Sequence, residues 1–249
     1  FSCFFFFTYT PPTDNYTLSL HDALPIFTRI ELATLVDRQF AAHGIDSAWR
    51  EAVCGMVERV LATPLDQHGK ICLRDIPAER RLVEMGFHYP IDPISGAGIA
   101  RLLLTQGFAR DEGVRRSLER LGFGEVQGFM RGFIDLVFES GGRFYLLDYK
   151  SNWLGGAAVQ YGRAQMGQAM VRENYYLQYL FYTLALHRYL RNRIPGYRYE
   201  THFGAVIYLF LRGVDPDSDR NTGVYRERPD AALIAALDDY IGHPRGDGA

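Results

Sequence analysis

The stretch GFIDLVFESGGRFYLLDYKSN, residues 132–152, contains two apolar runs on either side of a glycine pair. Residues 133–138 and 144–149 are rich in amino acids that favour β-strands. Gly141 and Gly142 lie between the two runs and are typical of a tight hairpin turn. The stretch therefore predicts a β-hairpin.

Each arm of this hairpin carries one carboxylate among apolar residues, Asp135 in the first and Asp148 in the second. An unpaired carboxylate in such a strand would be costly or would take up a proton. Lys150 follows Asp148 by two residues and so lies on the same strand face. Mg²⁺ takes one or two protein carboxylates and leaves its other positions for water and phosphate. The three residues thus predict a site for a divalent cation and a phosphate.

The same residues match a known motif. Asp135 followed by Asp148-Tyr149-Lys150 resembles the Asp…(Asp/Glu)-x-Lys core of the restriction-endonuclease-like PD-(D/E)XK superfamily. Gln178 and Tyr182 resemble the Gln-x-x-x-Tyr pattern of its RecB-like branch. Residues 146–155, 184–190 and 205–214 are similar to the C-terminal nuclease domain of RecB (beta) subunits of bacterial RecBCD exonuclease V. The short core alone is a weak signal, but together with these runs it is specific, and the resemblance extends from about Ser47 to the end of the chain.

The resemblance implies an α/β fold with a mixed central sheet flanked by helices. It implies a Mg²⁺-dependent deoxyribonuclease, with Ca²⁺ or Mn²⁺ as substitutes for Mg²⁺. In this reading Asp135, Asp148 and the backbone carbonyl of Tyr149 hold the metal, and Lys150 positions the attacking water. Gln178 and Tyr182 would lie beside the active site and support the substrate backbone and the catalytic strand.

The resemblance also implies partners and a cellular role. The substrate would be DNA, mainly a single strand delivered by a helicase, in double-strand break repair and recombination. RecC and RecD type subunits and a RecA type recombinase would be the protein partners, in the cytoplasm of a bacterium. A catalytically inactive docking module for those partners is the alternative. Inactive relatives usually lack one of the two aspartates or the lysine of the motif, and here Asp135, Asp148 and Lys150 are all present.

Residues 1–26 differ in character from the rest of the chain. Five of the first seven residues are Phe, and residues 16–26 resemble a translated sequencing adapter. We therefore expect 1–26 to be a non-native or disordered tail and 27–249 to be an N-terminally truncated RecB-type nuclease domain. The family completes its metal shell with an upstream histidine, and residues 27–60 contain no matching segment. His21 has the right spacing but lies in the adapter-like stretch, and His43 fits the end of a surface helix, so we expect an incomplete metal shell.

Composition narrows the function classes. The chain has 249 residues, of which 47% are hydrophobic and 22% charged, enough for one globular core. Cys3, Cys54 and Cys72 have no metal-type spacing, which indicates a reducing, cytosolic setting. A net charge of −2 is unusual for a protein that grips DNA by itself, so a larger assembly would have to deliver the strand. The chain has no phosphate-binding loop of the ATPase type, and its phenylalanine cluster is too short to span a membrane.

Periodicity predicts the remaining elements. We expect two helices within residues 28–62, the second capped by Asp46 or Ser47, and a strand over 78–89 that Pro90 stops. After a loop at 93–98, the other predicted elements are short helices at 99–107 and 113–121, a polar loop at 152–162, a helix at 174–193, a strand at 202–211 and a helix at 230–241.

Several single residues have two readings. Asp135 could instead form a strand-end turn, and the Asp148–Lys150 segment could be a solvated strand end. Glu84 is expected to face outward from an edge strand, with a role beside the metal as the alternative. Gln178 and Tyr182 could be a plain polar stripe on a helix. We expect the arginines at 188, 191 and 193 to form a solvated helix end.

Overall fold

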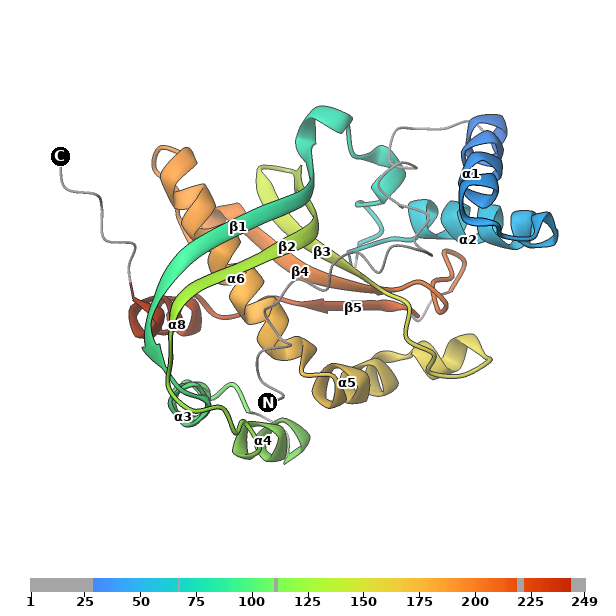
Figure 1. Ribbon diagram of the computed structural model, residues 1–249. Helices are drawn as coiled ribbons and strands as arrows, with labels where there is room; N and C mark the ends of the chain where they lie inside the picture. The colour runs from blue at the N-terminus through green and yellow to red at the C-terminus, as the bar shows by residue number, and fades with distance from the viewer. Residues whose placement is uncertain (1–28, 67, 110–111, 219–221, 243–249) are drawn as a thin grey trace.

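The computed structural model describes residues 29–66, 68–109, 112–218 and 222–242. Within these residues one mixed sheet has the strand order β1-β2-β3-β4-β5 (Figure 1). The strands are β1 (Arg81–Ile94), β2 (Val126–Ser140), β3 (Arg143–Lys150), β4 (Phe203–Phe210) and β5 (Val224–Glu227). Neighbouring strands are antiparallel except β3 and β4, which are parallel. This is the α/β architecture that the sequence predicted.

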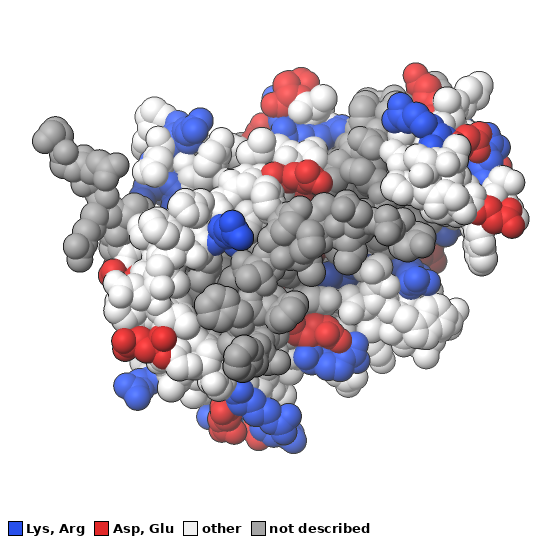
Figure 2. Space-filling model, viewed as in Figure 1, with Lys and Arg blue, Asp and Glu red and all other residues white. Residues whose placement is uncertain are grey.

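The helices flank the sheet. They are α1 (Arg29–His43), α2 (Arg50–Ala62), α3 (Gly96–Thr105), α4 (Glu112–Glu119), α5 (Arg163–Arg172), α6 (Tyr175–Arg193), α7 (Tyr199–His202) and α8 (Ala231–Ile241). Short 3-10 turns occur at Ser47–Trp49, Leu73–Asp75, Ala78–Arg80 and Ala158–Tyr161. None of these helices is long and apolar enough to cross a membrane. In Figure 2, Lys and Arg and Asp and Glu occur in small scattered groups over the described part of the face, among mostly uncharged residues.

The predicted hairpin is confirmed. β2 pairs with β3 from Ser140↔Arg143 to Leu136↔Leu147. Gly141 and Gly142 have φ values of 59° and 75°, the left-handed conformation at both central positions of a tight two-residue turn. A side chain at either position would strain this turn, which explains why the two glycines stand between the strand-forming runs.

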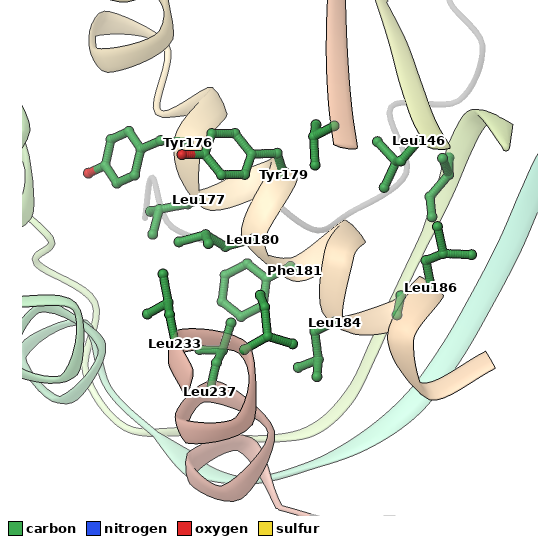
Figure 3. Packing of buried hydrophobic residues seen from close by; sticks show 14 of the residues in the cluster. Leu146, Tyr176, Leu177, Tyr179, Leu180, Phe181, Leu184, Leu186, Leu233 and Leu237 are labelled. Carbon is green, nitrogen blue, oxygen red and sulfur yellow. The ribbon is translucent and has the colours of Figure 1, made fainter. Parts of the chain in front are cut away.

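The sheet separates two hydrophobic cores. On one face Leu146, Val206 and Phe210 pack with α6 and α8, and on the other Leu147 and Ile207 pack with α1 and α2. Because both faces of β4 are covered, all eight of its residues are buried. Figure 3 shows apolar side chains of α6 directed at Leu233 and Leu237 of α8. This packing fixes α6 over the strand that carries Asp148.

The structure corrects several expected boundaries. Pro90 does not stop the first strand, because β1 continues to Ile94 and Pro90 pairs with Phe129. β1 is an edge strand of the described sheet, where the missing N–H of a proline can face away from the ladder. The expected loop at 93–98 is also wrong, since α3 already begins at Gly96 with Ser95 as its N-cap. α5 and β5 were not predicted.

The helix end at Arg188 is also different from the prediction. Arg188 is buried, not solvated, and its Nε lies 2.6 Å from Asp238 Oδ1 of α8. Arg191 Nη1 approaches Asp238 Oδ2 at 2.9 Å, and the Arg188 guanidinium lies 4.6 Å from the Tyr89 ring centroid of β1. Arg188 therefore ties α6 to α8 and to β1 and is not available to a phosphate.

Candidate active site

Asp135 and Asp148 are neighbours across β2 and β3. The ladder between these strands ends at Leu136↔Leu147, so the next position in register would set Asp135 against Asp148. Instead of a backbone bond at this point, Asp135 Oδ2 accepts a hydrogen bond from Tyr149 N at 2.9 Å. The side chain of Asp135 thus takes the place of main chain where the ladder between β2 and β3 ends, and the charges of the two carboxylates interact there.

The environment of Asp135 disfavours its charge. Burial raises the pKa of Asp135, and the charges of Asp148 and, to a smaller extent, Glu84 raise it further. The hydrogen bond from Tyr149 N and the positive charge of Lys150 act in the opposite direction without cancelling the rise. The pKa of Asp135 is therefore raised to about 7, first by burial and then by the neighbouring charge of Asp148.

Lys150 lies at the centre of the site. Its Nζ is 2.5 Å from Asp148 Oδ2 and donates a hydrogen bond to Gln178 Oε1 at 3.0 Å. The same Nζ lies 3.9 Å from the ring centroid of Tyr175 and 4.9 Å from that of Tyr208. Lys150 is only 8% exposed, so the ammonium is enclosed by one carboxylate, one amide and two aromatic faces.

Helix α6 supplies the polar partners of Lys150. Gln178 Nε2 donates to Tyr182 Oη at 3.0 Å, one helical turn further on. Tyr208 Oη of β4 donates to Gln178 Oε1 at 2.9 Å. Gln178 therefore connects the helix to both Lys150 and β4. The alternative that Gln178 and Tyr182 form a plain polar stripe on the helix surface does not agree with these contacts.

The structure brings Asp135, Asp148, Lys150, Gln178 and Tyr182 into one place. Tyr149 joins them through its backbone N–H, while His21 lies outside the described residues. Tyr175 and Tyr208 were not predicted as site residues. Tyr208 is next to Asp148 only because β3 and β4 pair in parallel with Asp148 opposite Tyr208, a register that one sequence does not specify.

Glu84 is the third carboxylate of this region. It is exposed, as expected for an outward-facing residue of an edge strand. Its φ of 49° is nevertheless in the left-handed region, which is rare for a non-glycine residue in a strand. The flanking pairs Val83↔Leu136 and Met85↔Ile134 set Glu84 against Asp135, whose pKa it raises. Glu84 thus lies at the margin of the site.

Comparison with known proteins identifies the family. A model of the PD-(D/E)XK nuclease superfamily matches residues 19–241. The chain belongs to this superfamily. Nucleases of the PD-(D/E)XK type are generally dependent on divalent metal ions. The resemblance noted in the sequence is therefore confirmed at the level of the family and of its fold.

Curated relatives place the chain beside RecB-type members of the superfamily. It is 44% identical over 199 residues to "RecBCD enzyme subunit RecB" of Escherichia coli (strain K12), covering 80% of this chain and 16% of that protein. The subunits of the same name from Haemophilus influenzae and Mycolicibacterium smegmatis are each 35% identical, over 82% and 83% of this chain. Those matches cover 16% and 21% of the relatives, so the chain spans about a sixth to a fifth of their length.

The residues present fit the divalent ion that PD-(D/E)XK nucleases generally require. Asp148 Oδ2 is a buried oxygen that receives no hydrogen bond, although the Lys150 ammonium lies beside it. The described residues contain no cluster of three or more His, Cys, Asp or Glu side chains that could hold a metal. Mg²⁺ needs only one or two protein carboxylates, and Asp135 and Asp148 supply them.

A cavity of about 770 Å³ between α5, α6 and α8 is lined by none of the predicted site residues.

We expect Asp135→Asn to stabilise the metal-free chain at neutral and alkaline pH. Because the pKa of Asp135 is raised in the folded chain, the folded state keeps a proton that the unfolded state has lost between about pH 4 and 7. Stability from this group is therefore present at low pH and is lost as pH rises through that window. Asparagine can still accept from Tyr149 N but carries no charge. The gain at about pH 8 should be at least about 1 kcal/mol, or ~2–4 °C in melting temperature.

Thermal melts in EDTA at about pH 4 and about pH 8 measure this difference. The exposed Asp75 provides the control variant Asp75→Asn, which should not change the pH dependence. An Asp135→Asn chain that melts below the wild type at alkaline pH would show that the two carboxylates do not repel each other in the folded state.

Proposed function

We propose that this chain is a Mg²⁺-dependent deoxyribonuclease domain that hydrolyses phosphodiester bonds of unwound DNA. The observation that carries the proposal is the enclosure of Lys150 between Asp148 and Gln178. The charge of Asp135 interacts with both Asp148 and Lys150. A buried lysine held only to stabilise a fold would be expected to balance the carboxylates around it. Here two carboxylates, Asp135 and Asp148, lie beside one ammonium, and a divalent cation would neutralise the excess negative charge.

Asp135, Asp148 and the backbone carbonyl of Tyr149 would hold the ion. When bound, the ion would polarise the scissile phosphate and lower the pKa of a coordinated water. Tyr149 N holds the Asp135 carboxylate through its hydrogen bond, so the orientation of Asp135 is set by the main chain of β3.

Lys150 would position the attacking water and offset charge on the phosphate. Its ammonium has three donors, of which one is used by Gln178 Oε1, and it forms an ion pair with Asp148 at 2.5 Å. Gln178 is itself fixed by hydrogen bonds to Tyr182 and Tyr208, so it holds Lys150 in place. The rings of Tyr175 and Tyr208 lie against the ammonium and help to hold it in place.

The substrate would be single-stranded DNA supplied by a helicase in a RecBCD-type assembly with RecC and RecD type subunits. The relatives named above are RecB subunits of the RecBCD enzyme. A net charge of −2 and the interspersed charges of the face in Figure 2 support delivery of the strand by other subunits. The setting would be the bacterial cytoplasm, in break repair and recombination, with a RecA type recombinase receiving the processed strand.

The proposal predicts metal-dependent cleavage by the chain. A 5′-labelled single strand incubated with the full chain should be degraded in Mg²⁺ or Mn²⁺ and should remain intact in EDTA, because the bound ion would polarise the scissile phosphate and activate the water. Calorimetry should show one ion bound at a site that is lost in the double variant Asp135→Asn, Asp148→Asn.

Three outcomes are informative. Cleavage that continues in EDTA would contradict a metal-dependent mechanism. Absence of both cleavage and metal binding would favour the alternative of an inactive docking module. Metal binding without cleavage would support the proposed ligands and would place the missing requirement outside the ligand set tested.

A further inference from the structure

The loop after Lys150 presents an indole to solvent. Trp153 is 67% exposed, although tryptophan is among the most apolar side chains. The chain has a second tryptophan, Trp49, which is 63% exposed and lies between α1 and α2 on the opposite face of the sheet from α6. The two residues have similar exposure, but only Trp153 lies beside the proposed active site.

The main chain on both sides of Trp153 is held in place. Leu154 N donates to Tyr161 Oη at 3.2 Å, and Tyr161 Oη lies 3.5 Å from Asn152 O. Tyr161 is 1% exposed and its ring packs on Gly213, where a Cβ would approach the ring to 2.1 Å. The indole therefore projects from a fixed part of the loop, which reduces the entropy that a ligand would have to remove.

The loop is also connected to the site. Tyr175 Oη donates to Asn152 Oδ1 at 3.2 Å, and the ring of Tyr175 lies 3.9 Å from Lys150 Nζ. Leu211 N donates to Lys150 O at 3.0 Å, which joins the start of the loop to the end of β4. Trp153 follows Lys150 by three positions, so their Cα atoms are at most about 11 Å apart.

A cation accompanies the indole. The Arg212 guanidinium lies 5.7 Å from the Trp153 ring, and Arg212 Nε donates to Ser151 O at 3.1 Å. Arg212 is exposed, and in the described part of the chain it forms no ion pair with a carboxylate. Its remaining N–H groups can bind a phosphate, since a guanidinium matches phosphate geometry.

We propose that Trp153 and Arg212 form a stacking platform for single-stranded nucleic acid next to Lys150. A base would stack on the indole while Arg212 binds a neighbouring phosphate, the combination typical of proteins that bind single strands without sequence preference. Bases inside a duplex have both faces covered by neighbouring bases, so the platform favours an unpaired strand. The inference rests on the proposed nuclease function, because it names how the substrate strand of that site is held.

Because the chain has only two tryptophans, stacking of a base on Trp153 can be followed by tryptophan fluorescence. In the Trp49→Phe chain Trp153 is the only tryptophan, and its fluorescence should be quenched when oligothymidylate is added in EDTA, where no cleavage occurs. An equal concentration of duplex of the same length should quench less. Quenching is a signature of stacking on the indole and does not depend on catalysis.

Variants give the energetic test. By fluorescence anisotropy of a labelled oligothymidylate, Trp153→Leu should weaken binding about 10-fold, since one stack is lost. Trp153→Phe should recover part of the loss, and the matched control Trp49→Leu should bind like the wild type. Arg212→Gln should weaken binding and reduce the slope of log K against log salt by about one.

The outcomes separate the platform from the nuclease. Binding of oligothymidylate without quenching, or equal affinities for Trp153→Leu and Trp49→Leu, would overturn the platform even if the chain cleaves DNA. An unchanged salt slope in Arg212→Gln would overturn the role of Arg212. Quenching with the predicted losses would support the platform whether or not metal-dependent cleavage is observed.

Discussion

Replacing Asp148 with alanine is expected to abolish metal-dependent cleavage, with a fall in rate of at least about 10³-fold, or ~4 kcal/mol in the activation barrier. Asp148 is 3% exposed, lies 2.5 Å from Lys150 Nζ and interacts electrostatically with Asp135. The change removes one of two proposed ligands and also the carboxylate that orients Lys150. Both effects act on the reacting groups, so the loss should be larger than that from any other single carboxylate in the chain.

Single-turnover degradation of a labelled single strand measures this loss. The fold should persist, because the repulsion between Asp148 and Asp135 is removed together with the ion pair to Lys150. Circular dichroism and melting in EDTA provide the check on the fold, and Asp75→Ala is the control for loss of an exposed aspartate. Full metal-dependent cleavage by the Asp148→Ala chain would remove Asp148 from the site.

The sequence was most informative where local rules determine structure. Gly141-Gly142 between two strand-forming runs specified the hairpin, and this set the register that brings Asp135 opposite Asp148. The aromatic-rich run at 174–193 was likewise predicted as a helix, and α6 is present there. In the described residues, the hairpin and the helix carry each predicted site residue, so the proposed ligands could be predicted before their geometry was known.

Other features depend on long-range contacts and could not be predicted in this way. Tyr208 reaches Gln178 only because β4 pairs in parallel with β3, and no local pattern encodes that register. Pro90 continues a strand because β1 lies at the edge of the described sheet. Arg188 is buried because Asp238, 50 residues later, neutralises it. In each case the partner is distant in sequence, and tertiary packing overrides the local preference.

Glu84 is an exception to the rule that local patterns predicted local structure. A strand was predicted through this residue, and the strand is present, but its backbone is in the left-handed conformation. A non-glycine residue in this conformation is strained, and Glu84 lies opposite the carboxylate whose pKa it raises. The strain and the charge repulsion occur at the same point, where β2 separates from β3. Strand propensity alone does not predict this backbone conformation.

The second large effect is expected for Lys150→Gln, which should lower the cleavage rate by about 10²–10³-fold while metal affinity is retained. Lys150 is a cation next to the two carboxylates, so its removal increases their attraction for a divalent ion. Calorimetry should therefore show an unchanged or tighter metal site. The chain offers a matched control, because Lys70 is its one other lysine and is exposed. Lys70→Gln should alter neither quantity.

Lys150→Arg distinguishes charge from shape. Arginine keeps a positive charge, but its planar guanidinium is larger than the ammonium enclosed by Tyr175, Tyr208 and Gln178. If Lys150 acts from a defined position on a water or a phosphate oxygen, arginine should restore little of the rate. Full recovery in Lys150→Arg would indicate that a general positive charge is sufficient. A fall in metal affinity in Lys150→Gln would instead mean that Lys150 serves to hold Asp148 in place for the ion, and the proposed contact with the reacting groups would be wrong.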